Sequence, residues 1–355
     1  MTRPARVIIN PQAARHNLAC VRRLAPQARV LAVVKADGYG HGIVRMARIF
    51  TDADAFAVAS IEEAVTLREA GVARPILLLE GPFEAAELAQ VAELGLEVVI
   101  HTEDQLAMLE AAPAPAAVWL KLDSGMHRLG FDPARFPAAL ARARALGSRL
   151  CFITHFANTH RRGDASVALQ VACFARALAG VNGARSLANS GAILGYPATH
   201  ADWVRPGLML YGVSPFDDEA GAALGLQPVM TLRSRLISVR RVRAGEAVGY
   251  GGAFVCPEDM PVGVVAYGYG DGYPRHAQTG TPVLVNGVRT QVIGYCSMDM
   301  MTVDLRPLPS AAFGAVVTLW GDGLPIEDVA RASGTVPYEL LCRVRMRAQY
   351  EEVTA

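Results

Sequence analysis

Lysine is rare in this chain, and its placement is the first pointer to chemistry. Of the 34 lysines and arginines only two are lysines, Lys35 and Lys121, which leaves 34 − 2 = 32 arginines. An ammonium group can lose its proton and become a nucleophile, whereas a guanidinium in a protein effectively cannot. Arginine therefore serves almost everywhere that positive charge is needed, and the two lysines require a separate chemical explanation. Lys35, in "VVKADGYGHG", is a candidate for forming a Schiff base.

Five polar residues end or follow short apolar runs along the chain. They are Lys35, Lys121, His155, Ser190 and Arg205. Any one of them alone would more often be structural, because a histidine at a strand end is usually just hydrogen-bonded and a serine before glycine usually caps a turn. In a parallel barrel, however, the carboxyl ends of the strands face the active site. Because both lysines lie at predicted strand ends, the sequence favours a functional site there.

The elements that would position these residues show a strand–helix rhythm from Leu31 to about Tyr211. Helix-like segments at 62–71 and 134–147 lie between the apolar runs, and the first ends at a glycine suited to a C-cap. This rhythm predicts an α/β fold with a TIM (β/α)8 barrel, and a doubly wound open sheet is the structural alternative. The predicted strands cover residues 31–35, 55–59, 76–80, 97–100, 118–123, 152–156, 186–190 and 201–205.

The pattern changes after about Leu226, where strand-like segments alternate with Gly, Asn and Asp turns. "VNGV" at 285–288 is a hairpin signal. We therefore expect a barrel over residues 1–225 and a second, mainly β domain over residues 226–355. About the first ten residues can pair with this second domain.

Composition limits the classes of function. With 355 residues, 52% hydrophobic and 19% charged, the chain suits a globular enzyme, and a formal net charge of +1 gives no reason to expect nucleic acid or an anionic membrane as partner. The six cysteines are widely scattered, which favours reduced core thiols and no metal site. Without an apolar h-region or a run long enough to cross a bilayer, we expect a cytoplasmic location.

A phosphate-binding position is also predicted. Ser190 and Gly191 follow the seventh strand, and "RPGLML" (205–210) follows the eighth, which is where barrels commonly bind phosphate. Together with a Schiff-base lysine, this points to pyridoxal 5′-phosphate as cofactor. A phosphosugar aldolase also uses a barrel lysine, but it would not explain the large β domain.

The ordered set of motifs resembles the alanine racemase family over almost the whole chain, from about Arg6 to Cys342. The motifs are "VVKADGYGHG", "KLDSGMHRLGF", "THFANT", "ANSGAIL", "VRPGLMLYG", "VGYGGAF", "GYGDGYPRHA", "SMDMMTVDL" and "YELLC". The resemblance implies an isomerase that interconverts L-alanine and D-alanine, supplying D-alanine for peptidoglycan or serving alanine catabolism. It also implies a homodimer with shared active sites.

The resemblance assigns cofactor contacts residue by residue. Lys35 matches the lysine that holds pyridoxal phosphate as a Schiff base and then acts as acid and base on one face of the substrate. Arg205, with His155 beside it, matches the arginine that faces the pyridine nitrogen; because arginine offers no carboxylate, the ring nitrogen should stay unprotonated, which favours reprotonation at Cα over transamination. The phosphate ligands that match are Tyr39, Ser190, the backbone at Gly207 and Leu208, and Tyr338.

The remaining matches concern the substrate. Racemisation most simply needs two acid–base groups on opposite faces, and Tyr250 of the partner subunit resembles the second. A free tyrosine has a pKa of roughly 10, so it needs cationic or hydrogen-bonding neighbours, which His155 and Arg205 would supply. Arg128 matches a residue near the substrate carboxylate, and Lys121 matches a lysine that is carbamylated in many relatives. Met298 and Asp299 resemble residues at the substrate end of the pocket, and Tyr269 resembles a gate residue paired with Tyr338.

Three departures from the family pattern stand out. Gly38 replaces the commoner alanine, Tyr295 replaces an arginine found in many members, and the segment 160–166, "HRRGDAS", is more basic than usual. None removes a predicted catalytic group. The alternatives are a serine or broad-specificity racemase, a decarboxylase of the same fold, which Arg205 disfavours, and a non-catalytic carrier of pyridoxal phosphate.

Overall fold

The computed structural model describes residues 3–112, 115–344 and 347–353. Its contacts divide the chain into two units. One comprises Arg15–Leu210 and Ser214–Glu219, and the other comprises residues up to Ala14, Tyr211–Val213 and all residues from Ala220. The helix α1 (Pro11–Leu24) contains the first boundary between them.

Eight parallel strands of the first unit close into a barrel, because β2 pairs with both β3 and β9. This confirms the predicted barrel and excludes the open sheet. Most of the strand residues are buried, as expected for a parallel sheet covered by helices. The strands are β2 (Arg29–Val33), β3 (Ala55–Val58), β4 (Ile76–Leu78), β5 (Glu97–Ile100), β6 (Ala117–Lys121), β7 (Arg149–Ile153), β8 (Ala184–Asn189) and β9 (Trp203–Arg205).

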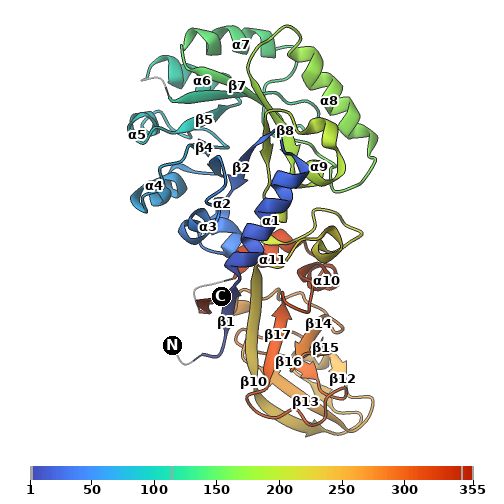
Figure 1. Cartoon of the computed structure of the whole chain (residues 1–355). Coiled ribbons are helices and arrows are strands. Elements are labelled where there is room, and N and C mark those ends of the chain that lie inside the picture. Colours follow the sequence, from blue (N-terminus) through green and yellow to red (C-terminus); the bar gives the residue numbers. More distant parts are fainter. Residues whose placement is uncertain (1–2, 113–114, 345–346, 354–355) are drawn as a thin grey trace. The chain divides into compact units, whose positions relative to one another are not determined.

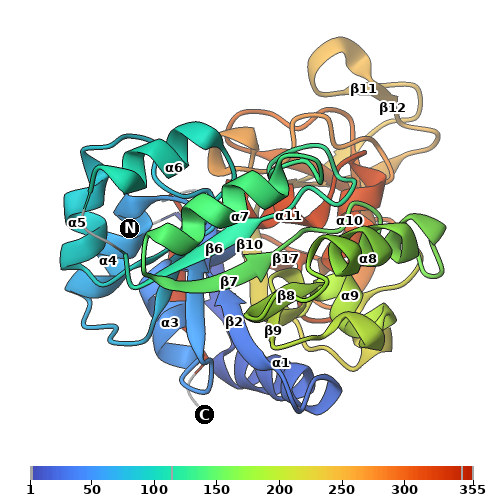
Figure 2. The ribbon, with the colours of Figure 1, turned by 90° about the horizontal axis from the view of Figure 1, so that it is seen from above.

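Helices lie around the outside of these strands (Figure 2). Their predicted counterparts at 62–71 and 134–147 are α4 and α7, and Gly71, at φ +83°, follows the C-cap of α4. The segments of this unit are α2 (Lys35–Gly40), α3 (Ile43–Ile49), α4 (Ile61–Glu69), α5 (Glu87–Glu93), α6 (Glu103–Glu110), α7 (Phe136–Ala145), α8 (Ala165–Ala177), α9 (Ser190–Gly195) and the 3-10 turn η1 (Pro197–Thr199). A further 3-10 turn, η2 (Leu208–Tyr211), crosses the second boundary.

The amino ends of the barrel strands are closed by structural contacts. The Glu97 carboxylate accepts a hydrogen bond from Trp119 Nε1 at 2.6 Å and pairs with Arg149. The Arg29 guanidinium stacks on the Trp203 ring, 4.2 Å from its centroid. In a barrel this face contributes stability, while chemistry belongs to the opposite face. The groups that do chemistry are therefore expected at the carboxyl ends of the strands.

The second unit is built on an eight-stranded sheet in the order β13-β16-β15-β14-β17-β10-β1-β18. Figure 1 shows β1, from the start of the chain, beside the long strand β10. Its strands are β1 (Arg6–Ile9), β10 (Met230–Val242), β13 (Met260–Val265), β14 (Pro282–Val285), β15 (Val288–Ile293), β16 (Met301–Asp304), β17 (Val316–Trp320) and β18 (Gln349–Glu352). The hairpin predicted at 285–288 is confirmed, with Asn286 and Gly287 at positive φ between β14 and β15.

Smaller elements complete this unit. A two-stranded ribbon joins β11 (Ala247–Val248) to β12 (Phe254–Val255). Two helices interrupt the strand pattern, α10 (Ile326–Ala332) and α11 (Pro337–Arg343), and the proline at the first position of α11 suits a helix start. The 3-10 turns are η3 (Gly221–Leu224), η4 (Tyr250–Gly252) and η5 (Tyr269–Asp271).

Candidate active site

Lys35 begins a turn of unusual hand. β2 ends at Val33, and in the turn α2 the residues Ala36, Asp37, Gly38 and Tyr39 have φ values of 53°, 53°, 61° and 53°. Left-handed conformations cost most L-residues energy, and glycine adopts them freely. A run of four such residues therefore needs support from its surroundings.

That support comes from side chains that bind the backbone of the turn. Asp37 Oδ1 accepts from Ile43 N at 2.7 Å, and Glu63 accepts from Ala36 N at 2.6 Å. The buried His41 uses Nδ1 to donate to the carbonyl oxygen of Tyr39 at 2.8 Å. Burial lowers the pKa of His41 to about 4, so this imidazole is neutral at physiological pH. The turn thereby holds Lys35 at the carboxyl end of β2.

Tyr39, Ser190 and Gly207 meet at the carboxyl ends of the strands. A Cβ placed on Gly207 would lie 2.5 Å from the Tyr39 hydroxyl oxygen, so only glycine lets this hydroxyl approach the backbone so closely. Ser190 Oγ accepts from Gly207 N at 2.9 Å and from Met209 N at 3.3 Å. The arrangement places two hydroxyl groups beside backbone N–H donors, next to the buried Leu208. These are the groups that bind phosphate oxygens in proteins.

Arg205 and His155 form a second part of the site. The buried Arg205 donates to Ser186 Oγ at 2.7 Å and to the Thr154 carbonyl oxygen at 2.6 Å, and its Nη2 lies 3.3 Å from His155 Nδ1. Because a guanidinium has no acceptor, Nδ1 of His155 must accept, which leaves the proton of the neutral ring on Nε2. Burial, followed by the charges of Arg205 and Lys121, holds the pKa of His155 well below its usual value. His155 is therefore a neutral hydrogen-bond donor at Nε2.

Lys121 is the last residue of β6 and lies in a field of positive charge. Its pKa is lowered to about 8 by burial and then by Arg205, Arg128 and Lys35, while Glu80 acts in the opposite direction. At pH 7 roughly one in ten such amines is neutral, against fewer than about one in a thousand at the ordinary lysine pKa. A site that carries these four cations favours an anionic ligand.

One supporting residue, Gln170, lies in no motif, and the sequence did not indicate its role. Gln170, buried on α8, donates to the His155 carbonyl oxygen at 3.0 Å and to Ser124 Oγ at 3.2 Å. Its Oε1 accepts from Ala157 N at 3.0 Å. Gln170 therefore fixes the segment that carries His155. A polar residue at an inward position of an amphipathic helix was the only signal for it in the sequence.

The other predicted site residues belong to the second unit and are largely exposed there. Tyr250 begins η4 and is 74% exposed, and Met298 is 55% exposed. Tyr338 lies near the start of α11 and is 42% exposed. Tyr269 begins η5 and is half-buried, as is Asp299, which accepts from Arg347 Nη2 at 2.6 Å. Arg128, in contrast, is an exposed residue of the barrel unit.

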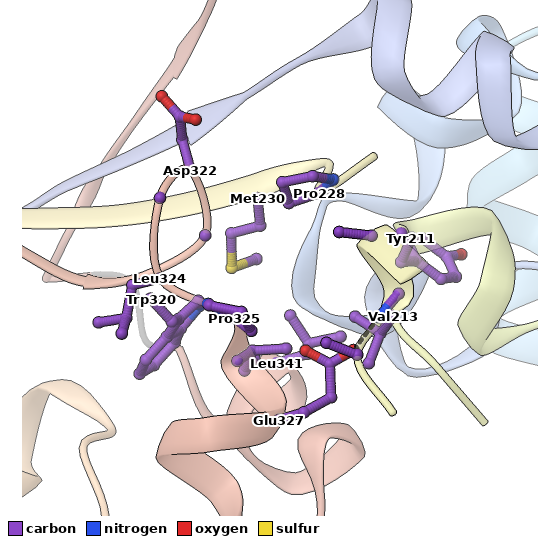
Figure 3. A pocket seen from close by; sticks show the side chains of 17 residues that line it. Tyr211, Val213, Pro228, Met230, Trp320, Asp322, Leu324, Pro325, Glu327 and Leu341 are labelled. Atoms are coloured by element: carbon purple, nitrogen blue, oxygen red, sulfur yellow. Dashed lines mark hydrogen bonds between the residues drawn. The ribbon is translucent and has the colours of Figure 1, made fainter. Parts of the chain in front are cut away.

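The second unit also contains a cavity of about 350 Å³ that none of the predicted site residues lines. In Figure 3, Tyr211 and Val213 lie on one side of this cavity and Trp320, Leu324 and Pro325 on the other. The cavity is therefore separate from the residues predicted to do chemistry. Among the described residues no cluster of His, Cys, Asp or Glu could hold a metal ion, and no helix is long and apolar enough to span a bilayer.

The barrel residues fit pyridoxal phosphate. The close approach of the Tyr39 hydroxyl to Gly207, with Ser190 and two backbone N–H groups beside it, suits a phosphate. Lys35 supplies the amine for a Schiff base, and the surrounding cations suit an anionic cofactor.

Comparison with known proteins agrees with this chemistry. The family described as "Alanine racemase, N-terminal domain" matches residues 9–215, and "Alanine racemase, C-terminal domain" matches residues 229–351. Alanine racemase of Nitrosospira multiformis is 52% identical, covering 98% of this chain and 99% of its own.

Solved structures match over the same length. The biosynthetic alanine racemase of Pseudomonas aeruginosa superposes with a TM-score of 0.97 at 47% identity, covering 99% of this chain and 100% of its own. Alanine racemase of Bartonella henselae, solved with covalently bound pyridoxal phosphate, superposes with a TM-score of 0.88 at 29% identity, covering 99% of each chain. This chain therefore belongs to the alanine racemase family of pyridoxal phosphate-dependent enzymes, which interconvert L-alanine and D-alanine.

Proposed function

We propose that this protein racemises alanine by a two-base mechanism in which Lys35 serves one face of the substrate Cα and Tyr250 of the partner subunit serves the other. The observation that carries the proposal is the group of cations at the carboxyl ends of the barrel strands, where the charges of Lys35, Arg128 and Arg205 all act on Lys121. This group suits both an anionic cofactor and the carboxylate of an amino acid.

Bound pyridoxal phosphate supplies electron withdrawal that acidifies the Cα proton of the attached amino acid. Lys35 would hold the cofactor and then carry the proton of one face. Tyr39, Ser190, the backbone of Gly207 and Leu208, and the Tyr338 hydroxyl would bind the phosphate. Arg205 would face the ring nitrogen. Since the guanidinium remains charged even with its pKa lowered to about 9, it can only donate there and leaves that nitrogen unprotonated.

His155 has a defined part in this mechanism. Its neutral ring accepts from Arg205 at Nδ1 and so presents Nε2–H as a donor. A hydrogen bond to a phenolate oxygen stabilises the charged form of tyrosine and lowers its pKa. We infer that His155 makes this bond to Tyr250 of the partner subunit, which would let that tyrosine act as a base.

A homodimer with shared sites is part of the proposal. Tyr250 is 74% exposed and lies among Gly249, Gly251 and Gly252, all at positive φ, so its position suits delivery to another chain. The partner's Met298 and Asp299 would line the substrate end, and Tyr269 would pair with Tyr338 as a gate. Arg128 would bind the substrate carboxylate.

Lys121 is proposed to carry a carbamate. Addition of CO2 needs a neutral amine, and the pKa of about 8 makes that form accessible. The amine nitrogen bonds to the carbon of CO2 and releases one proton to solvent, so the product is an anion, which would relieve the repulsion among the neighbouring cations and orient Arg128. We also propose a cytoplasmic location, which agrees with six cysteines that form no disulfide among the described residues.

Purified protein loaded with pyridoxal phosphate should be incubated in heavy water with each alanine enantiomer in turn. We expect optical rotation to fall to zero and deuterium to enter at Cα from either starting enantiomer. If neither change occurs although borohydride reduces the chromophore of the bound cofactor, the protein would be a non-catalytic carrier. That result would contradict the proposal. Faster racemisation of serine than of alanine would instead indicate a broad-specificity or serine racemase.

A further inference from the structure

The second unit contains an ion cluster around a buried carboxylate that no proposed step uses. Asp271, with an exposed fraction of 0%, accepts from Arg3 Nε at 3.0 Å and from Arg3 Nη2 at 2.6 Å. Arg347 Nε lies 3.3 Å from Asp271 Oδ1. A carboxylate removed from water persists when charged partners satisfy it, and two guanidinium groups do so here. The two arginines lie near opposite ends of the sequence, at positions 3 and 347 of 355.

The same two arginines also bind Asp299. Arg3 Nη2 donates to the Asp299 carbonyl oxygen at 2.7 Å, and Arg347 Nη2 donates to its carboxylate at 2.6 Å. Planar guanidinium groups with several donors are suited to joining two acceptors in a fixed geometry. Arg3 and Arg347 therefore connect η5, which ends at Asp271, to the segment that carries Met298 and Asp299.

Backbone contacts bring these two segments together at the residues of interest. Tyr269 N donates to the Ser297 carbonyl oxygen at 3.0 Å, and Gly270 N donates to the Met298 carbonyl oxygen at 2.8 Å. A Cβ on Gly268 would lie 2.4 Å from the carbonyl oxygens of Met298 and Ser297, so the approach requires glycine. Asp271 Oδ2 also accepts from Gly268 N at 2.9 Å, which ties the ion cluster to this contact.

We propose that Asp271, Arg3 and Arg347 are positioning residues that hold the gate residue Tyr269 and the substrate-lining residues Met298 and Asp299 in one fixed arrangement. This inference rests on the proposed function, which places those three residues at the substrate end of the partner's site. It assigns the first few residues of the chain a part in substrate binding. Loss of the cluster would free the two segments to move relative to each other without removing any group that touches substrate.

The chain offers a matched control for the arginine at the start of the chain. Arg6 lies three residues after Arg3 and pairs with the half-exposed Glu351 at 2.8 Å, away from Asp271. Arg6 Nη1 also donates to the Arg3 carbonyl oxygen at 2.7 Å, so the control changes the acidic partner: Glu351→Gln breaks this ion pair and keeps Arg6 and the cluster in place. Arg3→Lys is the conservative variant, because lysine keeps the charge and loses the two-pronged contact.

The test compares Arg3→Ala, Arg3→Lys, Asp271→Asn and Glu351→Gln in the holoenzyme. We expect the KM for alanine to rise about ten- to a hundred-fold in Arg3→Ala, with a smaller change in kcat, because displaced substrate-positioning groups cost about that much. Arg3→Lys should be intermediate, and Glu351→Gln should match wild type. The ratio of alanine to serine turnover should fall only in the cluster variants. A lower melting temperature with unchanged KM and unchanged selectivity would overturn the inference.

Amide hydrogen exchange separates a failure of this inference from a failure of the proposed function. In Arg3→Ala the amides of Tyr269 and Gly270 should exchange faster than in wild type, with the barrel amides unchanged. Unchanged exchange at both amides would overturn the positioning role even if the enzyme racemises alanine. A different result is that wild-type protein racemises no alanine while the amides of Arg3→Ala still exchange faster. That result would contradict the assigned substrate site, and the cluster would then have only a structural role.

Discussion

At the residue scale, the rarity of lysine was the most informative feature of the sequence. Both lysines lie at the carboxyl-terminal face of the barrel, Lys35 after β2 and Lys121 at the end of β6. Arginine could supply the charge at either place, but it could not form a Schiff base or accept CO2. The same reasoning could not find Gln170, whose role appears only when α8 packs against the His155 segment.

Lys35→Arg should abolish racemisation while keeping the positive charge. Arginine cannot form the imine, so the variant should neither show the Schiff-base absorbance nor retain pyridoxal phosphate after borohydride treatment and denaturation. Absorbance spectra and mass spectrometry of the denatured protein measure both. Retained covalent labelling in this variant would show that another amine holds the cofactor.

The lowered pKa of Lys121 predicts a pH dependence of carbamylation. The neutral amine, the form that adds CO2, becomes dominant as pH rises through about 8. Incubation with ¹³C-labelled bicarbonate should give a carbamate NMR signal that forms faster at pH 8.5 than at pH 6.5, at equal dissolved CO2. The signal should be absent in Lys121→Arg. If Lys121 stays unmodified at both pH values, the proposed carbamate is contradicted.

At the element scale, the eight barrel strands could be predicted because each is a short buried apolar run. Their ends were less well predicted. β7 runs from Arg149 to Ile153, whereas the sequence indicated 152–156, so His155 lies two residues beyond the strand. The pairing of β1 with β10 and β18 depends on contacts distant in sequence, which no local pattern specifies. The left-handed turn after Lys35 depends likewise on His41 and Glu63.

The turn should make stability depend on pH through His41. Its folded pKa of about 4 lies below the ordinary 6.5, so between these values the unfolded chain binds more protons than the native state. The free energy of unfolding should therefore fall as pH decreases from 6.5 to 4, by about 3 kcal/mol from this group. Urea unfolding of wild type and His41→Gln should show that the variant loses part of this dependence. The same loss in the exposed-histidine variant His127→Gln would refute the assignment.

At the scale of the whole molecule, the proposed sharing of each site between two subunits predicts complementation. Lys35→Ala and Tyr250→Phe should each be inactive as homodimers. In a hybrid dimer one site carries both changes and the other carries neither. Random reassociation makes half of the dimers hybrid, so activity should recover to about a quarter of wild type. Mixtures that remain inactive after verified subunit exchange would contradict the shared site.

The most direct test of the two-base claim is Cα exchange in heavy water by Tyr250→Phe, with Tyr295→Phe as a control that also removes an exposed tyrosine hydroxyl. With Lys35 intact, the variant should exchange the Cα proton of one alanine enantiomer and return it with unchanged configuration, while the other enantiomer should not exchange. The Tyr295→Phe control should racemise both. Continued racemisation by Tyr250→Phe, or equal exchange with both enantiomers, would contradict the mechanism.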